Sequence, residues 1–297
     1  MTLSRIGLEA GPLSQWLFAG LEADGLAAEL LETRHVRAAF RTMPVKTDRK
    51  DAWGIAQLMR LGWFKPVHCK SLAAQETRAL LTARKLLQTK RHDVEMSVRG
   101  VLRGFGLKVG VTTPRTFEVR VRELVDGHPT LMTVADALLA ARAELQRRFK
   151  DLEKRIVAIG KTDERVRRLV TVPGVGNLVA LTFTTAIDDP ARFRSSRQVG
   201  AYFGLTPSGH QSGETDVTGR ISKIGDHGVR TALYEAANVM LTRPVKGSAL
   251  KDWALAVASR AGPRKAKVAL ARKLAVILHR MLADGTTFVP RPASMAR

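Results

Sequence analysis

The sequence predicts an α/β N-terminal fragment followed by a mainly α-helical chain. Short apolar stretches suited to strands occur only in about the first 65 of the 297 residues. Beyond them, apolar residues recur at helical spacing through long stretches with little Pro or Gly. Hydrophobic residues make up 45% of the chain, which excludes a wholly disordered protein. We therefore expect three domains, at residues 1–65, 66–162 and 163–297.

The first predicted domain holds two strands and two helices. The strands are expected at residues 3–9 and 28–36, and the helices at 13–23 and 48–61. Thr47 is a suitable N-cap for the second helix, Gly62 ends it and Pro66 prevents its restart. Two strands are too few to close a sheet, so the segment is predicted to be part of a domain.

The second predicted domain is a helical arm. Two long helices are expected, at about residues 72–105 and 129–159, with a short helix near 116–125 between them. Apolar residues of the second long helix follow one another at intervals of 7, 4, 3 and 4, at Leu138, Leu145, Phe149, Leu152 and Ile156. This pattern is close to a heptad seam and predicts an antiparallel, coiled-coil-like hairpin. A solvated structural arm is the alternative.

The third predicted domain is helical, with glycine-rich connections. Helices are expected at residues 166–171, 177–187, 228–241 and 263–283, and a loop at 204–219. Residues 172–176, Val-Pro-Gly-Val-Gly, join the first two helices, and this arrangement is typical of a helix-hairpin-helix motif. Gly174 and Gly176 permit a tight turn with amide groups near a helix N-terminus, where a phosphate can bind. A turn that only packs the domain is the alternative.

Charge indicates the partner. The chain has 49 Lys and Arg against 27 Asp and Glu, a net charge of +22, and the first 65 residues contribute almost none of the excess. Such a field attracts polyanions, so nucleic acid is expected. No membrane partner is expected, because no run approaches the ~18 apolar residues of a spanning helix. The single Cys69 excludes an intramolecular disulfide and fits a reducing cytoplasm.

Three acidic residues could hold a metal ion. Asp48 and Asp51 share one helix face because they are three residues apart, and Glu9 at a strand end could approach the same ion. Carboxylates, waters and phosphates are the ligands that Mg²⁺ prefers. Acidic residues also stabilise a helix N-terminus, so a well-capped helix is the alternative.

A serine on the loop at residues 207–213 could attack a phosphodiester. Arg220 and Lys223 lie nearby in the sequence and could stabilise charge on phosphorus. The serine needs a base, for which His210 or a metal-bound hydroxide are candidates. A flexible loop of turn-forming residues is the alternative.

Taken together, these motifs resemble transposases of the insertion-sequence 110 family, which are bridge-RNA-guided recombinases. The resemblance covers nearly the whole chain. The motifs that carry it lie at residues 6–10, 46–52, 172–176, 192–193, 202–207, 211–213, 219–226 and 265–275. Their order and spacing, more than any single motif, make the match.

The resemblance implies a RuvC-like (RNase H-like) domain with an Asp-Glu-Asp-Asp metal tetrad, a helical arm and a C-terminal serine domain. Glu9, Asp48 and Asp51 would be the second to fourth acids, binding Mg²⁺, and Ser212 the nucleophile that forms a phosphoserine link to DNA. The predicted nucleic-acid contacts are Gly174, Gly176, Arg220, Lys223, Arg230, Lys265 and Lys267. A guide RNA, a homo-oligomer on DNA and a bacterial, nucleoid-associated location are also implied.

The first tetrad Asp of the family has no counterpart here. Eight residues precede Glu9 and none of them is acidic. We therefore expect either an N-terminally truncated gene or a start assigned too late, with weakened metal binding in this chain. Two further functions stay open: a RuvC-like metal nuclease that uses water as nucleophile, and a decayed, inactive transposase that only binds nucleic acid.

Overall fold

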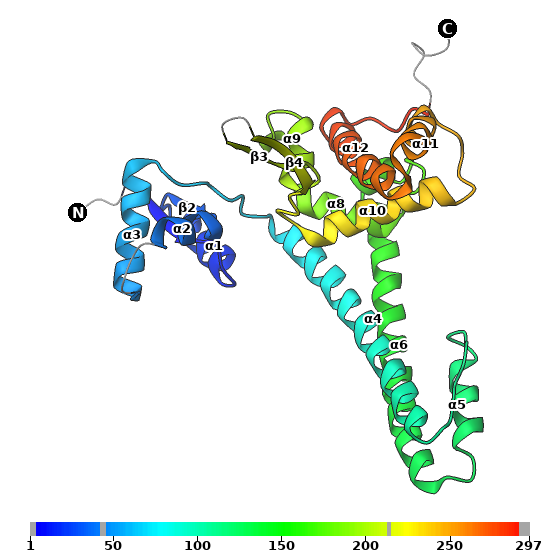
Figure 1. Ribbon diagram of the computed structural model, residues 1–297. Helices are drawn as coiled ribbons and strands as arrows, with labels where there is room; N and C mark the ends of the chain where they lie inside the picture. Colours follow the sequence, from blue (N-terminus) through cyan, green and yellow to red (C-terminus); the bar gives the residue numbers. More distant parts are fainter. Residues whose placement is uncertain (1–3, 42–45, 213–214, 291–297) are drawn as a thin grey trace. The chain divides into compact units, whose positions relative to one another are not determined.

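The computed structural model describes residues 4–41, 46–212 and 215–290. The chain divides into two compact units, Met1–Leu72 and Ala73–Arg297. The described residues are mostly helical, with two separate two-stranded sheets (Figure 1). None of their helices combines the length and apolar character needed to cross a membrane. The predicted mainly α-helical chain with a small α/β segment at its start is thus confirmed.

Over its described residues, the first unit contains a parallel pair of strands and three helices. They are β1 Ile6–Glu9, α1 Ser14–Ala23, β2 Ala28–Leu31, α2 Thr33–Phe40 and α3 Asp48–Leu61. Ile6 pairs with Ala28 and Glu9 with Leu31. Thr47 caps α3 by accepting a hydrogen bond from the Lys50 amide, and Gly62 ends the helix in the left-handed conformation, as predicted.

The prediction of a strand through Val36 is wrong. The strand ends at Leu31, and α2 begins two residues later. Helical spacing places Val36 in a small core with Leu31, Leu58 and Met59, which a continuing strand would not do. Burial of one apolar face therefore makes this segment helical, although its β-branched residues favour a strand.

The second unit begins with an arm of helices. They are α4 Leu72–Gly104, α5 Phe117–Val125 and α6 Pro129–Thr162, and α5 lies at the far end of the arm (Figure 1). Polar side chains join α4 to α6 in three pairs: Arg84 with Glu153, Arg91 with Gln146, and Glu95 with Arg142. Successive pairs advance seven and then four residues on α4 and retreat by the same steps on α6. The predicted antiparallel hairpin is confirmed.

The predicted seam of α6 faces inward. Phe149 and Ile156 are buried, while Leu138, Leu145 and Leu152 are half-buried. Arg142 lies on the same side and is only 5% exposed. The contact between the two long helices is therefore partly charged.

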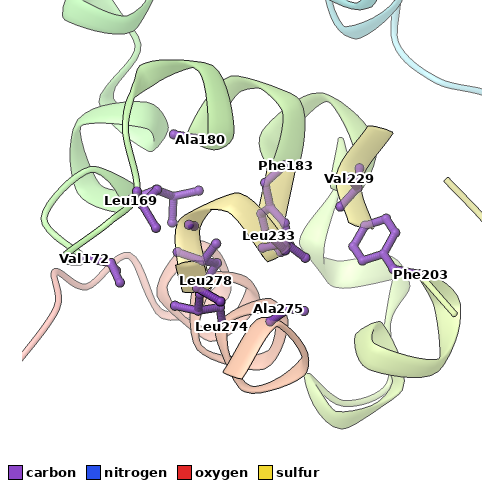
Figure 2. Close-up of a cluster of buried hydrophobic side chains, with 14 of the residues drawn as sticks. Leu169, Val172, Ala180, Phe183, Phe203, Val229, Leu233, Leu274, Ala275 and Leu278 are labelled. Carbon is purple, nitrogen blue, oxygen red and sulfur yellow. The ribbon is translucent and has the colours of Figure 1, made fainter. Parts of the chain in front are cut away.

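The rest of the second unit packs helices around one large apolar core. Its elements are α7 Glu164–Leu169, α8 Asn177–Ile187, a 3-10 turn at Pro190–Arg192, α9 Arg197–Tyr202, β3 Pro207–Ser212, β4 Thr215–Ile221, α10 His227–Thr242, α11 Ala249–Ala261 and α12 Pro263–Asp284. Phe183, Leu233 and Leu274 meet in this core from α8, α10 and α12 (Figure 2). Helices α9 and α11 were not predicted.

The prediction of a loop over residues 204–219 is also wrong. Strands β3 and β4 pair there as an antiparallel hairpin, with Gly209 opposite Thr218 and Ser212 opposite Thr215. Main-chain pairing holds these strands, and their small and polar residues give no apolar alternation from which a strand could be predicted.

Candidate catalytic and nucleic-acid-binding site

Ser212 lies at the closed end of the β3–β4 hairpin. It is the last residue of β3 and its side chain is exposed. The side chain of His210 and all of Gly213 fall outside the described residues, so the predicted base is not placed. The hairpin therefore presents Ser212 to solvent at its last cross-strand pair, with Thr215.

The neighbouring serines have different surroundings. The Ser208 hydroxyl donates a hydrogen bond to the Arg220 carbonyl oxygen at 3.0 Å. The half-buried Ser222 accepts one from the Ile224 amide at 3.5 Å. Both hydroxyls thus contact the main chain.

The base of the hairpin is held by close main-chain packing. Gly204 has a φ of +66°, and a Cβ there would lie 2.1 Å from the Ile224 oxygen. Gly225 has a φ of +85°, and a Cβ there would lie 2.2 Å from the Tyr202 oxygen. The Ser222 amide donates to the Thr206 oxygen at 2.9 Å. The segments entering and leaving the hairpin therefore lie against each other, and both glycines are needed for that approach.

Arg230, a predicted nucleic-acid contact, also holds this base. Its Nη1 donates to the carbonyl oxygens of Phe203, Ile224 and Gly225 at 3.2, 3.0 and 3.0 Å. Arg220 and Lys223 are exposed beside it in the sequence. Of these three cations, Arg230 is therefore bonded to the protein, while Arg220 and Lys223 face solvent.

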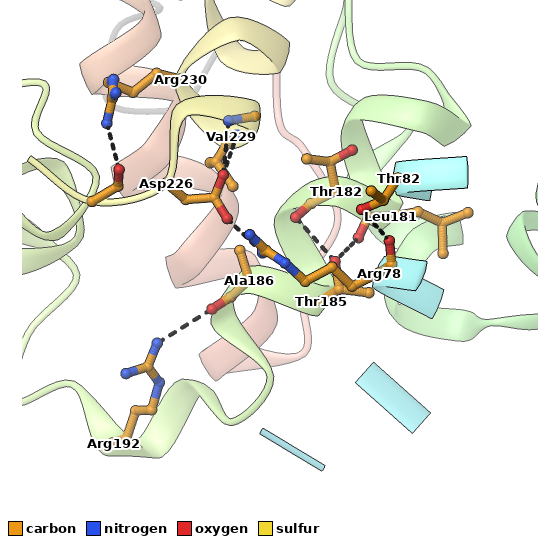
Figure 3. A network of polar contacts seen from close by, with 12 residues as sticks. Arg78, Thr82, Leu181, Thr182, Thr185, Ala186, Arg192, Asp226, Val229 and Arg230 are labelled. Atoms are coloured by element: carbon orange, nitrogen blue, oxygen red, sulfur yellow. Dashed lines mark hydrogen bonds and ion pairs between the residues drawn. The ribbon is translucent and has the colours of Figure 1, made fainter. Parts of the chain in front are cut away.

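Asp226 joins the hairpin base to helix α10 and to the arm. Its Oδ1 accepts from the amides of Gly228 and Val229 at 2.7 and 3.2 Å, and its Oδ2 accepts from Arg78 of α4 (Figure 3). Burial alone would raise the pKa of Asp226, but the charge and hydrogen bond of Arg78 and the two amides outweigh it and lower that pKa. The carboxylate is therefore ionised at neutral pH.

Sequence analysis missed this role of Asp226. An Asp directly before a helical pattern is a standard N-cap signal, so the cap could have been found. The Arg78 partner could not, because 148 residues separate the two side chains.

The two glycines of the predicted helix-hairpin-helix motif differ. A Cβ on Gly174, whose φ is +85°, would lie 2.6 Å from the Ala236 oxygen of α10. Gly176 is exposed at the N-cap of α8, with nothing within 4 Å of a Cβ. Gly174 thus packs the turn against α10, while Gly176 leaves the start of α8 accessible. Phosphate binding at this turn stays a prediction.

Glu9, Asp48 and Asp51 belong to the first unit. Arg5 donates to the Met59 oxygen, and a Cβ on Gly7 would touch Ile55 and Met59, so β1 packs against the second half of α3.

These acids do not form a complete metal cluster. Asp51 is half-buried, with Lys46 Nζ 3.9 Å away, while Glu9 and Asp48 are exposed. Within the described ranges, no group of three or more His, Cys, Asp or Glu is arranged to hold a metal ion. Their oxygen donors fit Mg²⁺ in chemical type, with substrate phosphates left to complete the shell.

Lys265 and Lys267 lie near the start of α12. Lys265 is exposed and Lys267 is half-buried. Helix α12 begins at Pro263, so both cations lie in its first two turns.

Comparison with known proteins gives a consistent result. Residues 166–251 match the family model for the transposase IS116/IS110/IS902 family, a range that includes the serine hairpin and the α7–α8 turn. The transposase for insertion sequence element IS1111A of Coxiella burnetii is 32% identical over 270 residues, which are 89% of this chain and 73% of the relative. A probable family 20 transposase of Pseudomonas aeruginosa is 30% identical over 82% of this chain and 74% of its own length. A putative transposase of Sinorhizobium fredii is 28% identical over 82% of this chain and 64% of its own length.

Proposed function

The chain belongs to the IS116/IS110/IS902 family of transposases, and from that membership we propose that it excises and inserts DNA through a covalent link to Ser212. In the proposed step the Ser212 hydroxyl gives its proton to a base and its oxygen bonds to phosphorus. The bond from phosphorus to the leaving sugar oxygen breaks, and that oxygen takes up a proton. The reverse step joins the DNA end to a new partner.

The observation that carries this proposal is the setting of Ser212. It lies at the exposed end of a hairpin whose base is fixed, while the hydroxyls of Ser208 and Ser222 are used by the main chain. Arg220 and Lys223 supply cations that favour the charge developing on phosphorus. A phosphate of the DNA backbone can reach the tip of this hairpin without entering a pocket.

The acids of the first unit complete the proposed chemistry. Glu9, Asp48 and Asp51, in a RuvC-like domain, would hold Mg²⁺, which when bound polarises a phosphate oxygen. The parallel β1–β2 pair, which ends at Glu9, and the packing of β1 against α3, whose first turn holds Asp48 and Asp51, support this grouping. Lys46, beside Asp51, would lose its partner to the ion.

The net charge of +22 supports DNA and a guide RNA as partners. The basic residues Arg220, Lys223, Lys265 and Lys267, with the amides after Gly176, would contact phosphates without reading bases. We further propose that the chain works as a homo-oligomer on DNA, with an arm between the metal and serine domains.

Trapping a protein–DNA adduct tests the nucleophile. Ser212→Ala should abolish the adduct and leave DNA affinity nearly unchanged, because a hydroxyl adds little to phosphate electrostatics. Ser222→Ala is the matched control and should keep the adduct. Loss of the adduct in Ser222→Ala alone would reassign the nucleophile. Cleavage by wild-type protein with no adduct would favour a metal nuclease that uses water.

A further inference from the structure

We propose that Arg78 is a positioning residue that fixes the serine hairpin through Asp226 and so makes the reactivity of Ser212 depend on helix α4. This inference rests on the proposed role of Ser212. Arg78 lies in the second turn of α4, close to where the chain passes from the first unit to the second at Leu72. Its ion pair with Asp226 ties that helix to the segment leaving β4.

The first link is a carboxylate shared between two elements. Asp226 Oδ1 is occupied by the first amides of α10, and Oδ2 by Arg78 Nη1 (Figure 3). The Asp226 side chain is 17% exposed, so water competes little for it. Arg78 therefore acts on the start of α10 and not on a mobile surface group.

The second link runs from Asp226 to both strands of the hairpin. Gly225, its neighbour, is pressed against Tyr202, and Arg230 of α10 bonds to carbonyl oxygens on both sides of the hairpin base. The Ser222 amide bonds to Thr206, which directly precedes β3. A displacement of Asp226 is thus passed to the ends of both strands together.

The hairpin magnifies such a displacement at its tip. From Pro207 to Ser212 the strand extends about 17 Å at ~3.3 Å per residue. A tilt of about 5° at its base would then move Ser212 by about 1.5 Å along this lever. Misplacement of a reacting group by about 1 Å can lower a rate by about 100-fold. A small change at Arg78 is therefore sufficient to change the rate at Ser212.

Loss of Arg78 should not unfold the protein. Helix α4 is also anchored by Leu80 and Leu81, which pack against the large core. The Arg78 side chain is 47% exposed and contributes little apolar burial. The variant is therefore expected to loosen the hairpin within a folded unit.

The test compares full-length variants on one DNA substrate. Arg78→Gln breaks the pair, Asp226→Asn breaks it while keeping a good N-cap, and Arg78→Lys keeps the charge. Arg84→Gln is the matched control, because it removes one charge and one ion pair of α4, with Glu153, away from the hairpin. Three quantities are measured: DNA affinity, the single-turnover rate of adduct formation at saturating DNA, and amide hydrogen exchange of residues 207–221.

We expect Arg78→Gln and Asp226→Asn to lower the adduct rate by about tenfold or more and to raise exchange in the hairpin. DNA affinity should match that of Arg84→Gln, whose adduct rate and hairpin exchange stay at wild-type values. Arg78→Lys should recover most of the rate. These results together support positioning.

Equal rates and equal exchange in Arg78→Gln and Arg84→Gln would overturn the inference. So would raised exchange with an unchanged adduct rate, or a rate loss explained entirely by weaker DNA binding. If the wild-type protein forms no adduct, the proposed function fails instead. Hairpin exchange then still decides whether Arg78 fixes the hairpin, and equal exchange in the two variants would overturn that too.

Discussion

The arm and the large core of the second unit hold their helices together by different means. In the core, aliphatic and Phe side chains of α8, α10 and α12 are almost fully buried. Along the arm, α4 and α6 meet through charged and polar pairs, and Arg84 and Arg91 also lie over the Phe149 ring at 4.7 and 5.6 Å. The core relies on apolar burial, whereas the arm combines directional contacts with a smaller apolar cluster at its far end, which includes Val98, Leu102, Phe117 and Leu139.

This difference indicates that the stability of the second unit and the alignment of α4 with α6 have different sources. Apolar burial is non-directional and scales with the area removed from water, so it contributes most of the free energy of folding. A polar pair contributes less, but it is satisfied only when two particular residues face each other. We infer that the core keeps the unit folded, while the pairs of the arm fix which turn of α4 faces which turn of α6.

The largest effect is expected in the core. Leu274 is 0% exposed, and Leu274→Ala should lower the free energy of unfolding by about 2–5 kcal/mol. Leu145→Ala on the half-buried seam of α6 is the control and should cost clearly less. Denaturant unfolding followed by circular dichroism measures both. Equal losses would mean that the arm also depends mainly on apolar burial.

A smaller, local effect is expected in the arm. Arg142 bonds to Glu95 at 2.7 Å and to the Pro114 oxygen at 3.0 Å, and it lies over the Phe117 ring. Arg142→Gln should lower the local stability of α5 and the arm end by about 1–3 kcal/mol, because it removes the hydrogen bond to a largely buried carboxylate, which keeps only its 3.9 Å ion pair with Arg91.

Hydrogen exchange of residues 117–139 measures this loss, and protection in α8 and α12 should not change. Arg147→Gln is the control, since its ion pairs with Glu144 and Asp151 are exposed and should contribute much less than the contacts of Arg142. A fall in protection across both regions would contradict the separation of arm and core.

A pH change should distinguish the two regions further. Burial of His279 lowers its pKa, an effect to which Arg192 adds and which the Pro190 hydrogen bond and Asp284 oppose. Because the folded pKa is lowered, the unfolded chain binds more protons below about pH 6.5, and core stability should fall as the pH falls to the folded pKa.

Glu144 of the arm should not respond in that range. Hydrogen bonds from Arg147 and Arg148 lower the pKa of Glu144 to about 2, so this carboxylate stays ionised. Unfolding measured from pH 7 to pH 5 should show a pH dependence that is reduced in His279→Gln. An unchanged pH dependence in that variant would assign the acid sensitivity to other groups.

The smallest effect on stability is expected at Lys265 and Lys267. Replacing both with Ala should change the unfolding free energy by less than about 0.5 kcal/mol. If each contacts a phosphate, the slope of log K against log salt should fall by about 0.9 per contact. Lys150 and Lys154 on the exposed arm are the matched pair. A fall confined to the arm pair would move the DNA contact from α12 to the arm.

The parts of the fold that the sequence predicted well have local causes. Helix α3 is bounded by Thr47 and Gly62, and α8 starts directly after Gly176, so caps and glycines were sufficient. Helix α2 was missed because its assignment depends on packing of Val36 against α3. Hairpin β3–β4 was missed because main-chain hydrogen bonds hold it together, and its side chains show no apolar alternation.

The candidate site likewise has parts that local motifs predicted and parts that depend on contacts between distant residues. Ser212, Glu9, Asp48 and Asp51 were chosen from motifs, and their chemical roles stay predictions. The contacts that fix the hairpin join residues distant in sequence, such as Arg78 with Asp226 and Arg230 with Phe203. No local pattern predicts such pairs, because only the folded chain brings them together.

Because the α4–α6 pairs take equal and opposite steps along the two helices, the arm can be lengthened by whole heptads. Inserting seven residues at matching points of both helices would lengthen it by about 10 Å, at 1.5 Å per residue, and leave every pair on either side intact. The same insertion in one helix alone would shift all pairs beyond it out of register. The spacing between the arm end and the serine domain can thus be altered without redesigning either, provided that both helices change together.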